Sequence, residues 1–142
     1  MKKVARLLVS AMLLVVMAVS LCSCGIPSDP EKAKSNLKDK GYYSEDSIST
    51  LAVKTYVLAK YHSTDGIDTV IFAISDDGKD NVLIIYCKDD DTVKNLNNDI
   101  KEIYKSVCEQ AKANDDEADI KSGKSGKVVY IGTSAGVKAA GW

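Results

Sequence analysis

The chain has 142 residues, with 19 basic and 20 acidic side chains, and its formal net charge at pH 7 is −1. A polypeptide of this length can bury the core of one domain, and it is too short for a two-lobed solute-binding protein. A near-zero net charge provides no bulk attraction to nucleic acid, so we expect no nucleic-acid partner.

The first 23 residues have the pattern of a secretory signal peptide. Three basic residues occupy the first six positions, and residues 7–21 are apolar except for two serines. This run is shorter than the roughly 20 apolar residues that a membrane-spanning helix needs. The pattern therefore predicts a signal peptide. The alternatives are a buried core helix and a secreted protein that is cut at another position.

The apolar run ends in Leu21-Cys22-Ser23-Cys24, which resembles the lipobox of bacterial lipoproteins. Leu21 fits the −3 position and Ser23 the small −1 position, whereas Cys22 departs from the usual small residue at −2. If Cys22 were the modified residue, the bulky Leu21 would lie at −1. The resemblance implies diacylglycerol on the sulfur of Cys24 and cleavage before it by the lipoprotein (type II) signal peptidase. Since two acyl chains anchor stably where one is marginal, we expect an extracytoplasmic location at the cell membrane.

This processing divides the chain into a cleaved signal peptide (1–23), a lipid-anchored tether (24–28) and a single domain (29–142). Loss of the three signal-peptide bases leaves 16 basic and 20 acidic residues, a net charge of −4. A mildly acidic protein has no bulk attraction to anionic lipid, so we expect the anchor, rather than a basic face, to provide the membrane contact. Four extended residues span at most about 14 Å, which would keep the domain close to the bilayer.

The first predicted helix runs from Asp29 or Pro30 to Lys40, and Gly41 fits the left-handed position that ends a helix. The next segment is ambiguous. The apolar residues of 50–61 alternate as in a strand, but a second set fits one face of a helix: Ile48, Leu51, Thr55, Leu58 and His62. The β-branched and aromatic content favours a strand over 50–61.

An apolar hairpin comes next, with strands over 68–75 and 81–88 and a turn at 76–80 in which Gly78 supplies a positive φ. Both strands are almost continuously apolar, which is typical of central strands with at least partial cover on the second face. The aspartates of 89–91 then cap a long helix, about 91–113, whose core stripe recurs at intervals of three and four residues: Val93, Leu96, Ile100, Ile103 and Val107.

A possible short strand at 120–121, a strand at 127–133 and a short helix at 134–140 complete the chain. The order predicts an α+β fold: an antiparallel sheet of three to five strands with the long helix on one face and short N- and C-terminal helices. This layout is similar to that of small uncharacterised lipoproteins of Gram-positive bacteria. The likeness spans most of residues 30–140, implies no catalytic residue, and rests on Pro-Glu-Lys-Ala at 30–33, Gly41-Tyr42, Ser-Gly-Lys at 125–127 and Gly132-Thr133.

Two of the four cysteines, Cys87 and Cys108, remain once Cys22 is removed and Cys24 is acylated. Cys108 lies roughly 25 Å along the long helix, whereas Cys87 lies near the start of that helix. A disulfide needs Cα atoms within about 7 Å of each other. We therefore predict two buried free thiols.

No residue pattern predicts a catalytic site, a cofactor site or a metal site. His62 is the only histidine, it has no evident partner, and we expect it in solvent. The lysines of 121–127 lack the spacing of a phosphate loop and indicate a flexible cationic turn, or a small patch for phosphate or an anionic polymer. The aspartates around Gly78 (Asp76, Asp77 and Asp80) lack the spacing of a calcium loop.

The sequence therefore favours a membrane-anchored interaction module that is not an enzyme, with an envelope protein or a small envelope ligand as its partner. Two alternatives remain. A small envelope hydrolase would bring together loop carboxylates, for example Asp76 or Asp80 with Asp115 or Asp119. The second alternative is a surface protein that acts as an inhibitor or has a protective role.

Overall fold

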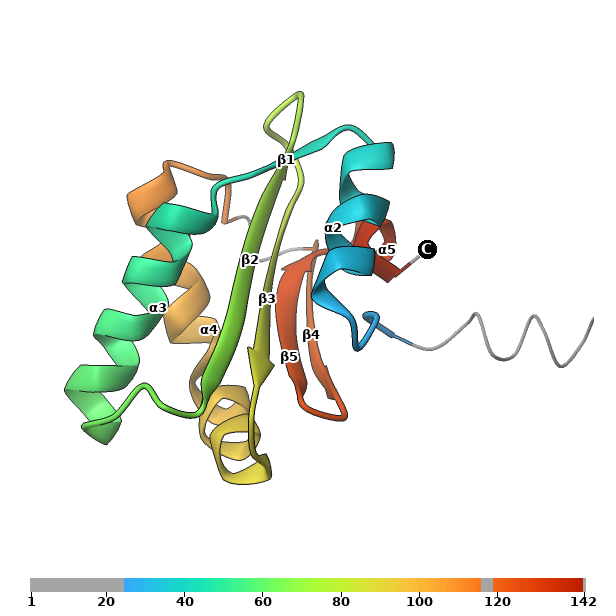
Figure 1. Ribbon diagram of the computed structural model, residues 1–142. Coiled ribbons are helices and arrows are strands. Elements are labelled where there is room, and N and C mark those ends of the chain that lie inside the picture. Colours follow the sequence, from blue (N-terminus) through green and yellow to red (C-terminus); the bar gives the residue numbers. More distant parts are fainter. Residues whose placement is uncertain (1–24, 116–118, 142) are drawn as a thin grey trace, which may run out of the picture.

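The computed structural model describes residues 25–115 and 119–141 (Figure 1), so the predicted signal peptide and Cys24 lie outside the described residues. Among the described residues, no helix is both long enough and apolar enough to cross a bilayer. Helices and strands follow in this order: α2 (Pro30–Asp39), β1 (Tyr42–Ser44), α3 (Asp46–Tyr61), β2 (Ile67–Ser75), β3 (Asn81–Cys87), α4 (Asp90–Ala111), β4 (Ile120–Ser125), β5 (Val128–Thr133) and α5 (Ser134–Gly141).

The five strands form one antiparallel sheet in the order β1-β2-β3-β5-β4. Helices α3 and α4 cover one face of the sheet, and the terminal helices α2 and α5 cover the other (Figure 1). The predicted α+β class is confirmed, with its antiparallel sheet, its long helix and its short terminal helices. The hairpin of β2 and β3 lies at the centre of the sheet, as its two-sided apolar pattern predicts.

Residues 46–61 form helix α3, so the predicted strand over 50–61 is wrong. The helix buries Ser49, Ala52, Val53 and Val57, which recur with helical spacing. At its end, His62 adopts a left-handed conformation and its N–H donates to the carbonyl oxygen of Leu58 at 3.0 Å. β-Propensity reflects how well a side chain fits a packed surface, and here contact with the sheet and α4 overrides it.

The sheet has an apolar core on each face because successive side chains of a strand point to opposite sides. Phe72, Leu83 and Ile131 are fully buried under α3 and α4. Ile71 and Ile84 are fully buried on the other face, under α2 and α5. Each central strand therefore needs a helical layer on both sides.

A buried polar contact ties α4 to the start of β3. The Tyr104 hydroxyl donates to Oδ1 of Asn81 at 2.5 Å, and Asn81 Nδ2 donates to the carbonyl oxygen of Asn114 at 2.6 Å. Both side chains are buried, and burial is the main cause of the raised pKa of Tyr104. This contact fixes the position of α4 along the sheet, because a buried polar group is costly unless it is paired.

The start of the described chain packs against the domain. Ile26 is buried in the core under α2 and α5, and the carbonyl oxygen of Pro27 accepts a hydrogen bond from the Tyr86 hydroxyl at 2.9 Å. Gly25 has a φ of +86°, and a Cβ there would lie 3.3 Å from Oγ of Ser125. The segment expected to act as a tether is thus held by the fold almost from its first residue.

Two neighbouring substitutions distinguish the helix from the strand over 50–61. In a strand, Leu51 and Val53 would share one face, whereas in α3 Leu51 is 66% exposed and Val53 is fully buried. We expect Val53→Ala to lower the free energy of unfolding by about 2 kcal/mol, from the loss of two buried methyl groups and the cavity they leave. Leu51→Ala should change it by less than about 0.5 kcal/mol. Urea unfolding measures both, and equal losses would contradict the helix.

Candidate functional site

Large apolar side chains point into solvent along the outer face of α3. Ile48 is 38% exposed, Leu51 is 66% exposed and Leu58 is 54% exposed. Their spacing of three and seven residues places them on one side of a helix, opposite the buried Ala52 and Val53. We call these three residues the α3 stripe. Single exposed apolar residues are common, but a row of them on one helix is typical of an interaction surface.

The inner face of α3 explains why the α3 stripe points outward. Ala52, Val53 and Val57 are small, and they pack into the core with Phe72 of the sheet. The N-terminal end of the helix is fixed to β2, because the Glu45 N–H donates to the carbonyl oxygen of Phe72 at 2.7 Å. The small inner side chains lie against the sheet, which leaves the larger leucines in solvent.

A polar network joins α3 to α4 beside the stripe. The carboxylate of Asp99, only 8% exposed, accepts hydrogen bonds from Lys60 Nζ at 2.8 Å and from the Tyr61 hydroxyl. The Tyr56 hydroxyl donates to Oε2 of Glu102 at 2.5 Å. Lys60 Nζ also lies 5.9 and 5.8 Å from the ring centroids of Tyr56 and Tyr61, within the range of cation–π contacts. These contacts hold α3 in one orientation, so the α3 stripe is presented on a fixed surface.

The network sets the charge state of Asp99. Burial alone would raise the pKa of Asp99, but hydrogen bonds from Lys60 and Tyr61, together with the charge of Lys60, outweigh it and lower that pKa. The same hydrogen bond is the main cause of the raised pKa of Lys60. Both partners therefore stay ionised at neutral pH, and the contact between α3 and α4 is a charged one.

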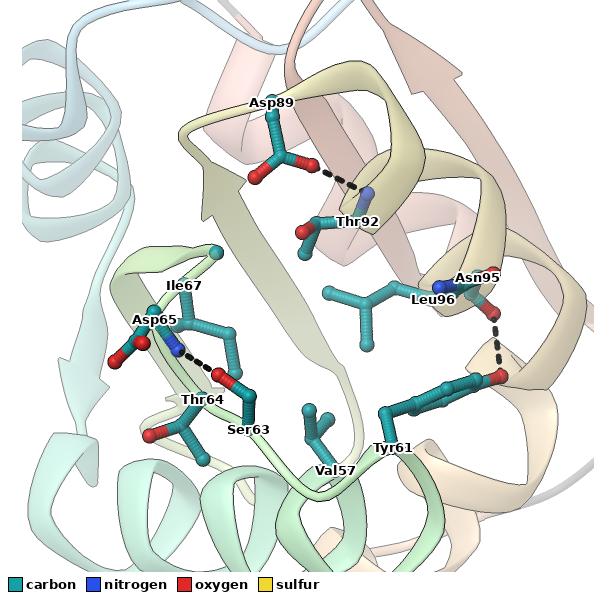
Figure 2. A pocket seen from close by; sticks show the side chains of 11 residues that line it. Val57, Tyr61, Ser63, Thr64, Asp65, Ile67, Asp89, Thr92, Asn95 and Leu96 are labelled. Atoms are coloured by element: carbon teal, nitrogen blue, oxygen red, sulfur yellow. Dashed lines mark hydrogen bonds between the residues drawn. The ribbon is translucent and has the colours of Figure 1, made fainter.

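A pocket of about 290 Å³ lies between the C-terminal end of α3 and the N-terminal end of α4 (Figure 2). Val57, Ile67 and Leu96 give it an apolar part. Several of its polar groups are engaged locally: the Thr92 N–H donates to the carboxylate of Asp89 at 2.7 Å, and the Asp65 N–H donates to Oγ of Ser63 at 3.2 Å. These bonds order the loop and cap α4, so several of the polar groups that line the pocket already have a role in the fold.

The backbone approaches α4 closely at Gly66, in the loop that lines this pocket. A Cβ at position 66 would lie 1.9 Å from Oγ1 of Thr92, so no larger residue fits without movement. The Lys88 N–H donates to the carbonyl oxygen of Gly66 at 2.8 Å. The loop after α3 is therefore fixed against the start of α4, close to the Asp99 network.

Two of the carboxylates considered for a hydrolase lie in segments that meet, because Asn81, next to Asp80, donates from Nδ2 to the carbonyl oxygen of Asn114, next to Asp115. Asp76 and Asp80 lie at the tip of the β2–β3 hairpin, where Asp76 is exposed. Asp115 lines a second pocket, beside Tyr104, and Asp119 accepts a hydrogen bond from the Ser134 hydroxyl at 2.7 Å. Among residues 25–115 and 119–141, no hydrogen bond joins the hairpin pair to the other pair. The same residues contain no group of three histidine, cysteine or acidic side chains placed to hold a metal ion.

The remaining residues considered from sequence have structural positions. His62 is exposed, as predicted, at the end of α3. Cys87 and Cys108 are buried free thiols, as predicted, and burial is the main cause that raises the pKa of each to about 12. Such thiols remain protonated and act as small apolar side chains.

The cationic segment 121–127 is more ordered than the predicted flexible turn. Strand β4 extends to Ser125 and pairs with β5 along its whole length, from Ile120 with Thr133 to Ser125 with Val128. Only Gly126, with a φ of +58°, and Lys127 form the turn. Backbone pairing is independent of side-chain type, so a polar, glycine-containing sequence can form an edge strand.

Comparison with protein-family models finds no match, and searches of curated proteins and of solved structures likewise find no match. The function must therefore be inferred from the residues of this chain. Among the described residues, the α3 stripe brings together three of the four exposed large apolar side chains, and the fourth is Tyr43 on β1.

We expect Asp99→Asn to lower the free energy of unfolding at about pH 7 and to have little effect at about pH 2. The folded-state pKa of Asp99 is lowered, so its contribution is complete above the unfolded pKa of about 4 and is lost as pH falls through the folded pKa. Urea unfolding at both pH values measures the difference. Asp68→Asn, at an exposed position of β2, is the control. If Asp99→Asn lowered the free energy of unfolding as much at about pH 2 as at about pH 7, the lowered pKa assigned to Asp99 would be wrong.

Proposed function

We propose that this protein is a cell-envelope lipoprotein, held by lipid on Cys24 at the extracytoplasmic face of the cell membrane, and that its domain binds a protein partner through the α3 stripe. The observation that carries the binding proposal is the exposure of three large apolar side chains in a row on a rigidly held helix. Burying each of them in an interface would contribute about 1.5–3 kcal/mol at most, which favours association.

The position of the stripe favours a protein partner over the lipid bilayer. Helix α3 lies on one side of the sheet, whereas the described chain begins on the other side, next to α2 and α5 (Figure 1). Ile26 is already buried in the domain, so Cys24 is separated from the fold by only Gly25. An anchor this short leaves little freedom for the domain to rotate, and the α3 stripe then faces away from the bilayer.

The charges around the stripe indicate the chemistry of the partner. Lys54 is exposed on α3, one turn from both Leu51 and Leu58. Leu51 and Lys54 also border a shallow hollow with Asp46, Ser47 and Thr50. We infer that the partner is an envelope protein with an apolar helix or strand face that carries an acidic residue opposite Lys54.

Lipid attachment is tested on protein purified from the membranes of producing cells. We expect mass spectrometry to find diacylglycerol on Cys24 and no residues before it, and we expect Cys24→Ala to yield unprocessed chain without lipid. Two acyl chains bind membranes stably, so nearly all of the unsubstituted protein should partition into a detergent phase. An unmodified Cys24 preceded by residues 1–23 would contradict the anchor.

Docking is tested with a photo-crosslinking amino acid placed at Thr55, within the stripe, and at Lys94 on the exposed side of α4. We expect a crosslink to one envelope protein from position 55 and none from position 94. The double variant Leu51→Glu/Leu58→Glu should abolish it while changing stability by less than about 1 kcal/mol, because both side chains are exposed.

Asn98→Glu on α4 is the charge control and should leave the crosslink intact. A crosslink that persists in the double variant would contradict the stripe as the docking surface. A crosslink to a second copy of this chain would contradict a separate partner and would indicate that the α3 stripe forms a homodimer interface.

A further inference from the structure

Charge is distributed unevenly between two parts of this domain. Residues 25–41 and 120–141 contain eight lysines and three acidic residues, whereas residues 42–119 contain eight lysines and 17 acidic residues. The first set forms α2, β4, β5 and α5, and the second forms α3, α4 and the β2–β3 hairpin. The net charge of the processed chain is therefore the sum of a basic part, which includes both terminal helices, and an acidic part.

The basic part is where the described chain begins. A Cβ at Gly25 would lie 3.3 Å from Oγ of Ser125, at the end of β4. A Cβ at Gly141, at the end of α5, would lie 3.1 Å from the carbonyl oxygen of Gly25. Gly25 therefore lies next to the β4–β5 hairpin and the end of α5.

We propose that this basic part binds the anionic phospholipid headgroups of the membrane that holds Cys24, an inference that rests on the proposed lipid anchor. We call it the anchor face and define it by exposed lysines that form no ion pair among the described residues: Lys32, Lys38, Lys40, Lys121 and Lys138. Lys124 is not included because it pairs with Val129, whose side chain lies on the α4 face of the sheet. Lys34 is not included because its Nζ pairs with Asp46 at 3.4 Å. Lys127 is not included because its charge lies close enough to Asp89 to lower the pKa of that carboxyl.

The headgroups would act as a second attachment that orients the domain. A lysine close to an anionic membrane surface contributes about 1 kcal/mol, and this attraction decays over the Debye length of about 8 Å at physiological salt. Lys138 lies one turn before Gly141, where an added Cβ would lie 3.1 Å from the carbonyl oxygen of Gly25, so its position on α5 keeps it within reach of the surface. The aspartates of the β2–β3 hairpin tip are repelled by the same surface; the Asp76 N–H donates to the carbonyl oxygen of Gly41, so this tip lies at the C-terminal end of α2. Together these forces turn the anchor face toward the bilayer and the α3 stripe toward the envelope.

The orientation is tested by lysine footprinting of the lipid-bearing protein, reconstituted in vesicles of phosphatidylcholine alone or with phosphatidylglycerol. Acetylation at each lysine is read by mass spectrometry. We expect phosphatidylglycerol to reduce the reactivity of Lys121 and Lys138 by about fivefold, the factor that corresponds to about 1 kcal/mol per lysine. Lys94 and Lys105, exposed on α4, should be unchanged. High salt should remove the protection, because it screens the attraction.

Paired variants separate orientation from simple coverage. We expect Lys121→Glu/Lys138→Glu to remove the protection of Lys32 and Lys38, because the domain loses its preferred orientation. The matched control Lys94→Glu/Lys105→Glu should retain that protection. All four positions are exposed, so neither pair should alter folding beyond about 1 kcal/mol.

The outcomes distinguish this proposal from the anchor itself. Lysines that stay equally reactive on both kinds of vesicle, in protein whose mass shows the lipid on Cys24, would overturn the headgroup contact alone. A mass without the lipid would overturn the anchor and this proposal with it. Protection by soluble polyphosphate but not by vesicles would assign the anchor face to an anionic polymer and overturn the assignment to lipid.

Discussion

Strands β2 and β3 bury side chains on both of their faces, and this constraint determines the rest of the architecture. Phe72 and Leu83 point to one side, and Ile71 and Ile84 point to the other, all fully buried. A sheet with two apolar faces needs a helical layer on each side, since exposure of either face would forfeit roughly 1.5–3 kcal/mol per large side chain. The long helix α4 cannot cover both faces, so three further helices are required.

The two helical layers have different surfaces. Helix α3 meets the sheet through small residues and is held to α4 by the contacts of Asp99, which leaves its large apolar side chains outside. Helices α2 and α5 bury most of their apolar residues and present lysines to solvent. The layer that receives the start of the chain is thus basic, whereas the opposite layer combines an acidic surface with the α3 stripe.

The first residues after Cys24 link these surfaces to the proposed anchor. Ile26 is buried in the domain, and the carbonyl oxygen of Pro27 accepts a hydrogen bond from the Tyr86 hydroxyl, so both residues are part of the fold. A long flexible linker would let the domain sample many orientations, whereas a chain fixed from Gly25 onward restricts them. Lipid on Cys24 would therefore set which surface faces the bilayer, in addition to keeping the protein there.

Much of the fold follows from local patterns in the sequence. Continuous apolar runs flanking a turn with Gly78 predicted the central hairpin, and the spacing of Val93, Leu96 and Ile100 predicted the long helix; both are confirmed. The burial of Cys87 and Cys108 as free thiols is also confirmed. These features depend on residues close together in the chain, for which periodicity alone is informative.

Tertiary contacts decided the identity and orientation of α3. Its sequence fits both periods, and the helical set of Ile48, Leu51 and Leu58 suggested by the pattern is the solvent face, whereas the smaller Ala52 and Val53 form the core face. The sequence alone determined the class of fold, the central hairpin and the lipobox-like start. Only the structure decided which face of α3 is exposed and which segments lie beside Gly25, because both depend on residues that are far apart in the chain.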